Sequence, residues 1–196
     1  WIVAITNAVN LIDGLDGLAV GVSSIASFSL LVIALLVSEP AIAVLIAALA
    51  GACIGFMPYN LIPAKIFMGD SGALFLGYIL ATVSIQGLFK LYALISFVVP
   101  FLILGLPIFD TAFAIIRRIA KGQSPMKADR GHLHHKLIDM GFSQKQAVAI
   151  LYCLSAMLGL CAVVLTGNGV IRALLLLLAA LVVALFAAKM LGDGAE

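Results

Sequence analysis

The chain has 196 residues, of which 64% are hydrophobic and only 10% charged, and its formal net charge is +2. A soluble domain is typically about half apolar and about a quarter charged, so this composition excludes an ordinary soluble enzyme and indicates an integral membrane protein. The cysteines Cys53, Cys153 and Cys161 all lie in apolar runs. We therefore expect them to be small buried side chains, not a disulfide framework or a metal-binding set.

The first nine residues are apolar but too few to cross a bilayer, which takes about 20 helical residues. We interpret them as the end of a truncated helix and expect further residues upstream. Six longer apolar runs follow, and each should be a helix because backbone in lipid must satisfy its own hydrogen bonds. The sequence thus predicts an all-α fold, a polytopic transmembrane helical bundle forming one integral-membrane domain, with spans at residues 18–37, 41–59, 72–88, 92–116, 147–166 and 170–190.

The basic residues predict which ends of these spans face the cytoplasm. Only Lys90 and Arg172 fall on one side of the predicted membrane, and every other Lys and Arg falls on the opposite side. Positive charge stays cytoplasmic, so the loops at residues 60–71 and 117–146 are predicted to be cytoplasmic. Alternation of the spans places residues 10–17 there too. The polar clusters therefore share one face, which predicts a single active site on the cytoplasmic face of the plasma membrane.

Two clusters suggest a site for a divalent cation. Asn10, Asp13 and Asp16 recur every three residues, which on a helix forms one continuous stripe. Such oxygen ligands suit Mg²⁺, which keeps several waters and shares substrate phosphates, whereas a calcium loop needs a longer pattern with a terminal Glu. Asp70, between glycines just before a span, favours metal or phosphate binding at a helix start. A plain helix cap is the alternative for Asp70.

The histidine cluster has three interpretations. His132, His134 and His135 lie in a run rich in basic residues that includes Arg130. Nearby cations disfavour a zinc ion and favour an anion such as a pyrophosphate, and the third reading is a basic loop lying on anionic lipid headgroups. Asp110 precedes Arg117 by seven residues on the same predicted helix face, so we expect these two residues to pair rather than to enter the site.

Four motifs in order carry a resemblance to a known family. They are NAVNLIDGLDGLA at residues 7–19, NLIPAKIFMGDSG at 60–72, PIFDT at 107–111 and HLHHK at 132–136. This set resembles the polyprenyl-phosphate N-acetylhexosamine-1-phosphate transferases, the MraY/WecA/TagO family of glycosyltransferase family 4. The His-x-His-His form is similar to the WecA/TagO branch. The resemblance covers nearly the whole chain.

The resemblance implies a Mg²⁺-dependent enzyme, with Mn²⁺ as a substitute ion. It would transfer N-acetylhexosamine 1-phosphate, expected to be N-acetylglucosamine 1-phosphate, from a UDP-sugar to undecaprenyl phosphate, releasing UMP in the first membrane step of cell-wall or surface polysaccharide synthesis. By motif, Asp70 and Asn10 correspond to the metal site. The uridine pocket corresponds to Gly14, Leu15, Asp16 and Phe67, and further polar residues of the site correspond to Asn60 and Asp13. The pyrophosphate or sugar-phosphate contacts correspond to His132, His134 and His135, and the neighbouring Arg130 is expected to bind the substrate as well.

The same resemblance implies that this chain is a C-terminal portion. Family members have about ten spans and an upstream Asp-rich motif, which carries the expected base and is absent from residues 1–196. The expected partners are the UDP-sugar, the polyprenyl phosphate and membrane lipid, with a homodimer as the candidate assembly and no nucleic acid. The alternatives are a secondary transporter, which would place charges at mid-membrane and show repeats, and a non-catalytic membrane fragment.

Overall fold

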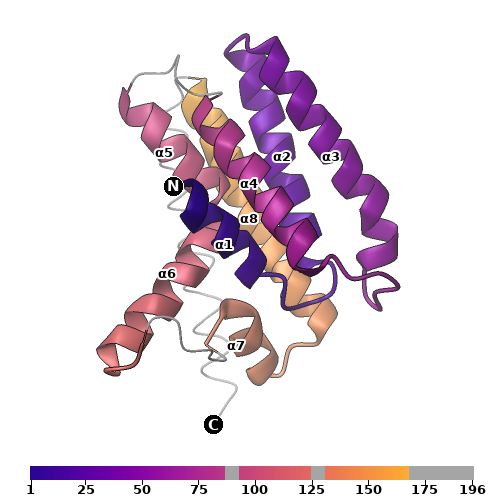
Figure 1. Ribbon diagram of the computed structural model, residues 1–196, viewed down its shortest axis with the longest axis vertical. Helices are drawn as coiled ribbons and strands as arrows, with labels where there is room; N and C mark the ends of the chain where they lie inside the picture. Colours follow the sequence, from indigo (N-terminus) through magenta and orange to yellow (C-terminus); the bar gives the residue numbers. More distant parts are fainter. Residues whose placement is uncertain (87–92, 125–130, 168–196) are drawn as a thin grey trace.

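The computed structural model describes residues 1–86, 93–124 and 131–167, and all regular elements in these residues are α-helices (Figure 1). The predicted all-α fold is therefore confirmed. The helices are α1 (Ile2–Leu11), α2 (Leu18–Leu36), α3 (Pro40–Asn60), α4 (Gly69–Gln86), α5 (Ala93–Ile103), α6 (Gly105–Ala120), α7 (Leu133–Asp139) and α8 (Gln144–Thr166).

The long helices α2, α3, α4 and α8 follow the long axis of the molecule (Figure 1). Helix α2 is central, because it packs along both α3 and α8, while α1 packs against α4. Their shared core consists of aliphatic side chains such as Ile33, Ile46 and Leu80, which are almost completely buried. This packing holds the ends of the helices in fixed relative positions. The loops that connect the helices at one end are therefore held in fixed positions too.

Among the described residues, α2, α3 and α8 are long and apolar enough to cross a membrane, and α5 with α6 adds a fourth crossing if the bent pair is one span. The predicted spans at 18–37, 41–59 and 147–166 match the first three helices. Helix α4 covers most of the predicted span at 72–88, although it is not among the helices that are both long and apolar enough to cross a membrane. The predicted span at 170–190 lies outside the described residues.

The run at 92–116 differs from the single straight span that its composition suggests. It is broken at Leu104, and the axes of α5 and α6 differ by 84° across the break. Pro107 explains the break, because proline has no N–H to donate to the carbonyl of Ile103 and its ring clashes with that carbonyl in a continuous helix. As a result, α6 diverges from the bundle and descends toward α7 (Figure 1).

The expected helical stripe of Asn10, Asp13 and Asp16 is not formed. Helix α1 ends at Leu11, so Asn10 lies in its last turn while Asp13 and Asp16 lie in the loop that follows. Gly17 ends this loop with φ at 80°, a left-handed conformation that glycine adopts at little cost. Of the three polar residues, only Asn10 is therefore in a helix, and they do not form one helix face. Asp70, in contrast, lies in the first turn of α4, as predicted.

Gly21→Ala is expected to destabilise the bundle. A Cβ at Gly21 would overlap the aromatic ring of Tyr152 on α8, whereas nothing lies within 4 Å of a Cβ built at Gly51 on α3. Overpacking of this kind typically costs about 1–3 kcal/mol. Thermal unfolding in detergent should show a lower melting temperature for Gly21→Ala and no decrease for the matched control Gly51→Ala. Equal melting temperatures would contradict the close α2–α8 contact.

Candidate active site

Three segments that are far apart in the sequence meet at one end of the bundle (Figure 1). They are the loop at residues 12–17 after α1, the loop at residues 61–68 between α3 and α4, and helix α7. These segments carry most of the residues singled out from the sequence. The Lys and Arg residues that the structure describes lie at this same end, on the loops and helix ends at Lys65, Arg117, Arg118, Lys121, Lys136 and Lys145.

Asn60 joins the two loops. This last residue of α3 is 3% exposed, and both the oxygen and the nitrogen of its carboxamide form hydrogen bonds. Its Oδ1 accepts a hydrogen bond from the backbone N–H of Gly17 at 3.2 Å, and its Nδ2 donates to the carbonyl of Ile66 at 3.0 Å. A buried amide with both groups paired is strongly held, because leaving either one unpaired is costly. Asn60 therefore acts as a structural joint as well as a wall of the site.

Two more contacts hold the first loop in place. One carboxylate oxygen of Asp16, Oδ2, accepts from the backbone N–H of Ala64 at 3.0 Å, which ties the loop at residues 12–17 to the loop at residues 61–68. The hydroxyl of Tyr152 on α8 donates to the carbonyl of Gly17. The first loop is thus anchored to α3, to the second loop and to α8.

Acidic side chains from the first loop and from the start of α4 come together beside this joint. The Nδ2 of Asn10 donates to Oδ1 of Asp70 at 3.1 Å, across 60 residues of sequence. Burial, followed by the negative charges of Asp70 and Asp16, raises the pKa of Asp13 to about 6. Like charges held close together disfavour ionisation, and a bound cation would relieve this repulsion. The predicted grouping of Asn10, Asp13, Asp16 and Asp70 is therefore present in the structure.

This cluster fits an ion that takes few ligands from the protein. In the described part of the chain, no group of three or more His, Cys, Asp or Glu side chains is arranged to hold a metal ion alone. Mg²⁺ commonly binds through one or two carboxylates and completes its shell with waters and substrate phosphates. The exposed Asp70 carboxylate, with Asn10 beside it, suits that mode of binding.

A polar cavity of about 250 Å³ opens beside the acidic cluster. Six of the residues singled out from the sequence line it, together with Met68, which the sequence interpretation did not select. Phe67 stands at the rim with 75% of its surface exposed. An exposed aromatic ring beside a polar cavity can stack on a planar ligand group. The lining residues are Asp13, Gly14, Leu15, Asp16, Asn60, Phe67 and Met68.

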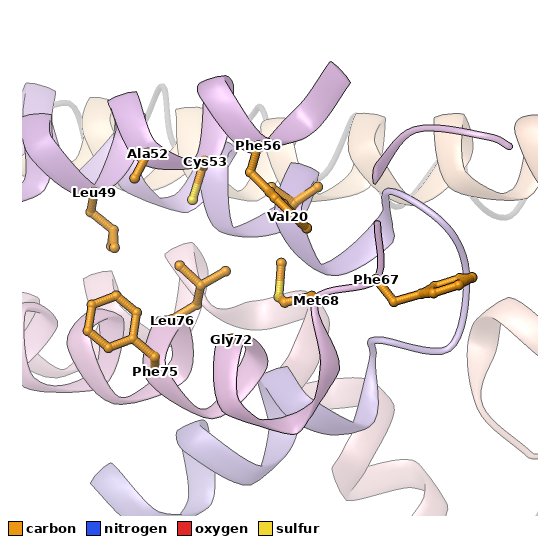
Figure 2. Close-up of a pocket in the computed structure, with 10 residues that line it drawn as sticks. All are labelled: Val20, Leu49, Ala52, Cys53, Phe56, Phe67, Met68, Gly72, Phe75 and Leu76. Atoms are coloured by element: carbon orange, nitrogen blue, oxygen red, sulfur yellow. The ribbon is translucent and has the colours of Figure 1, made fainter. Parts of the chain in front are cut away.

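An apolar groove of about 220 Å³ adjoins the polar cavity (Figure 2). It lies between α2, α3 and α4, and it shares Phe67 and Met68 with the polar cavity. Figure 2 shows Phe67 at the loop end of the groove and Leu49 and Phe75 at the opposite end. A polar cavity and a hydrocarbon surface therefore meet at one place.

The histidines of α7 lie against the first loop. His134 is 2% exposed, and a Cβ at Gly14 would lie 2.5 Å from its Nε2. Burial, together with the neighbouring His135, lowers the pKa of His134 to about 4, so this imidazole is neutral at pH 7. The rings of His134 and His135 have centroids 4.3 Å apart, and His135 is half-buried. Only a residue without a side chain at position 14 allows this approach.

The expected pairing of Asp110 with Arg117 is wrong. The Asp110 carboxylate lies within hydrogen-bond distance of His132 and of the N–H of Leu133, while Arg117 donates to the carbonyl of Gly131 at 2.8 Å. The bend before α6 brings Asp110 to α7, which spacing along one helix could not predict. Arg130, another predicted contact, lies outside the described residues.

Comparison with known proteins gives consistent matches. The model of the family described as glycosyl transferase family 4 matches residues 1–88. The chain is 48% identical over 165 residues to a probable undecaprenyl-phosphate N-acetylglucosaminyl 1-phosphate transferase of Bacillus subtilis (strain 168), covering 84% of this chain and 46% of that protein. It is 38% identical over 171 residues to a decaprenyl-phosphate N-acetylglucosaminephosphotransferase of Mycolicibacterium smegmatis, covering 76% of this chain and 42% of that protein.

A third relative carries the name of a different transferase. The chain is 37% identical over 163 residues to a phospho-N-acetylmuramoyl-pentapeptide-transferase of Staphylococcus aureus (strain JH9), covering 82% of this chain and 48% of that protein. The chain thus spans just under half the length of these curated relatives. From the family match, these identities and the four motifs that converge at one end of the bundle, we conclude that the chain belongs to glycosyl transferase family 4, the polyprenyl-phosphate hexosamine-1-phosphate transferases.

Proposed function

We propose that the whole protein containing this chain transfers N-acetylglucosamine 1-phosphate from UDP-N-acetylglucosamine to a polyprenyl phosphate such as undecaprenyl phosphate. The observation that carries the proposal is the polar cavity, which has the acidic cluster on one side and Phe67 at its rim. The adjoining apolar groove supports a substrate that combines a charged head with a hydrocarbon tail. Two relatives are named as transferases of the same sugar phosphate to polyprenyl phosphates.

In the proposed reaction, an oxygen of the lipid phosphate attacks the β-phosphorus of the UDP-sugar. The new oxygen–phosphorus bond forms as the bond from the β-phosphorus to the bridging oxygen breaks, and UMP leaves with that oxygen. Both reactants are anions, so the protein must offset their repulsion and align them. This reaction would begin the assembly of a lipid-linked cell-wall or surface polysaccharide.

Asp70 and Asn10 are the residues that would hold the divalent cation, which we propose to be Mg²⁺ with Mn²⁺ as a substitute. When bound, such an ion neutralises charge on the donor diphosphate. The pKa of Asp13 is raised first by burial and then by the negative charges of Asp70 and Asp16, and a bound cation would offset those charges. The exposed Asp70 carboxylate presents oxygen toward the loop end of the bundle, and the hydrogen bond from Asn10 fixes its orientation.

Asp16, Leu15, Gly14 and Phe67 are proposed to bind the uridine. The Phe67 ring would stack on the base, and the Asp16 carboxylate, already oriented by Ala64, would accept from it. His134 and its neighbour His135 would donate to the phosphate oxygens. Among the described residues, no group of three or more His, Cys, Asp or Glu side chains is arranged to hold a zinc ion. The secondary-transporter alternative gains no support, since the polar clusters gather at one end of the bundle.

Asp70→Asn should abolish transfer while leaving the fold intact. The amide keeps the shape of the carboxylate and caps a helix about as well, but it removes the charge that the cation needs. The assay is UMP release by the whole protein titrated with Mg²⁺. Glu39→Gln is the control, because Glu39 precedes α3 at the opposite end of the bundle. Near-normal activity of Asp70→Asn at any Mg²⁺ concentration would contradict the metal-binding role of Asp70 and leave it only a helix-capping role.

Phe67→Ala should weaken UDP binding by about 1–3 kcal/mol, the scale of a lost aromatic–base stack. Phe75→Ala is the matched control, because Phe75 lines the apolar groove but not the polar cavity. Isothermal titration calorimetry of UDP against the whole protein measures both variants. Equal affinities for Phe67→Ala and the wild type would remove Phe67 from the nucleotide site.

Labelling in intact cells tests the proposed cytoplasmic position of the site. In a background without native cysteines, Cys in place of Gln123, after α6, should resist an impermeant thiol reagent until the cells are permeabilised. Cys in place of Ser38, between α2 and α3, should react at once, because these two exposed positions lie at opposite ends of the bundle. The reverse pattern would place the site outside the cell and contradict its access to a cytoplasmic nucleotide sugar.

A further inference from the structure

Asp110 is a carboxylate buried in an otherwise apolar stretch of α6, with 3% of its surface exposed. A charge in such a place is costly unless it is paired and hydrogen-bonded. Neither the acidic cluster nor the polar cavity includes this residue. Its position therefore requires a separate explanation.

Both oxygens of Asp110 are directed to the start of α7. Oδ2 lies 2.9 Å from Nδ1 of His132, and Oδ1 accepts from the backbone N–H of Leu133 at 2.6 Å. His132 is the residue that precedes α7, and Leu133 is the first residue of the helix. Helices as short as the 7 residues of α7 are not stable alone, so they depend on contacts of this kind. Hydrogen bonds to an ionised carboxylate are among the stronger ones available.

From this anchor, a chain of contacts leads to the polar cavity. The ring of His132 stacks on that of His134 with centroids 5.7 Å apart and an angle of 8° between the planes. His134 in turn lies against Gly14, which is a wall of the cavity. The start of α7 is held by Asp110, and the first turn of the same helix carries His134 and His135. Any shift at the anchor moves both histidines relative to Gly14.

We propose that Asp110 is a positioning residue, which fixes α7 through His132 and Leu133 so that His134 and His135 are held against the loop at residues 12–17. Asp110 itself does not contact the reacting groups. The effect on turnover rests on the proposed function, whereas the effect on the order of α7 does not. Asp110→Asn is the informative variant, because it keeps the volume and one oxygen acceptor but removes the charge that His132 and Leu133 share.

A double-mutant cycle in the whole protein tests whether Asp110 acts through His134. Asp110→Asn should lower kcat on the order of 10²-fold, the scale of a misplaced catalytic group, with a smaller change in KM for the UDP-sugar. Combined with His134→Ala, it should add little to the loss caused by His134→Ala alone. Asp139→Asn, which changes an exposed carboxylate at the end of α7, is the control and should retain activity.

Hydrogen–deuterium exchange provides a second measurement that needs no activity. Asp110→Asn should speed exchange of the amides of α7 while those of α2 and α4 keep their protection. Losses that multiply in the double mutant, or unchanged exchange in α7, would overturn the proposal. Faster exchange throughout all helices would also overturn it, because Asp110 would then serve the fold as a whole. A wild-type protein without transfer activity would contradict the proposed function alone, and the exchange result would still decide the role of Asp110.

Discussion

The site depends on one buried carboxamide more than on any other single group. Asn60 accepts from Gly17 and donates to Ile66, so it joins the loop after α1 to the loop before α4. Burial, followed by the negative charges of Asp70 and Asp16, raises the pKa of Asp13 beside this joint. The hydrogen bonds of Asn60 hold the loop that carries Asp13 and Asp16 beside the start of α4, which carries Asp70.

The membrane imposes the second constraint. A carboxylate or carboxamide in the interior of the bundle needs hydrogen-bond partners, because an unpaired one is costly in a medium without water. Asp110 meets this condition through His132 and Leu133, and Asn60 meets it through the loops. The polar side chains of the site therefore lie at the loop end of the bundle, where the helix ends provide backbone hydrogen-bond donors. The apolar groove begins where this polar region ends.

The sequence was sufficient to predict the helical fold, most of the spans and the residues that line the cavity, because apolar runs and the four motifs are local patterns. It failed where the outcome depended on tertiary contacts. The stripe of Asn10, Asp13 and Asp16 assumed a helix that instead ends at Leu11. The pairing of Asp110 with Arg117 assumed that both partners belong to one helix, whereas the break caused by Pro107 turns Asp110 toward α7. Pro107, two residues after Gly105, was the available signal for that break.

The bond from Tyr152 to Gly17 also sets an order of events during synthesis. Its partners are 135 residues apart in the sequence, so a growing chain cannot form it until α8 has been made. Until then, the loop that carries Asp13 and Asp16 is held by its contacts with the segment at residues 60–66 and by the packing of His134 against Gly14. Domains are synthesised from the N-terminus, and contacts between distant residues form late. The anchor of this loop to α8 therefore forms only after the segments that line the cavity have been synthesised.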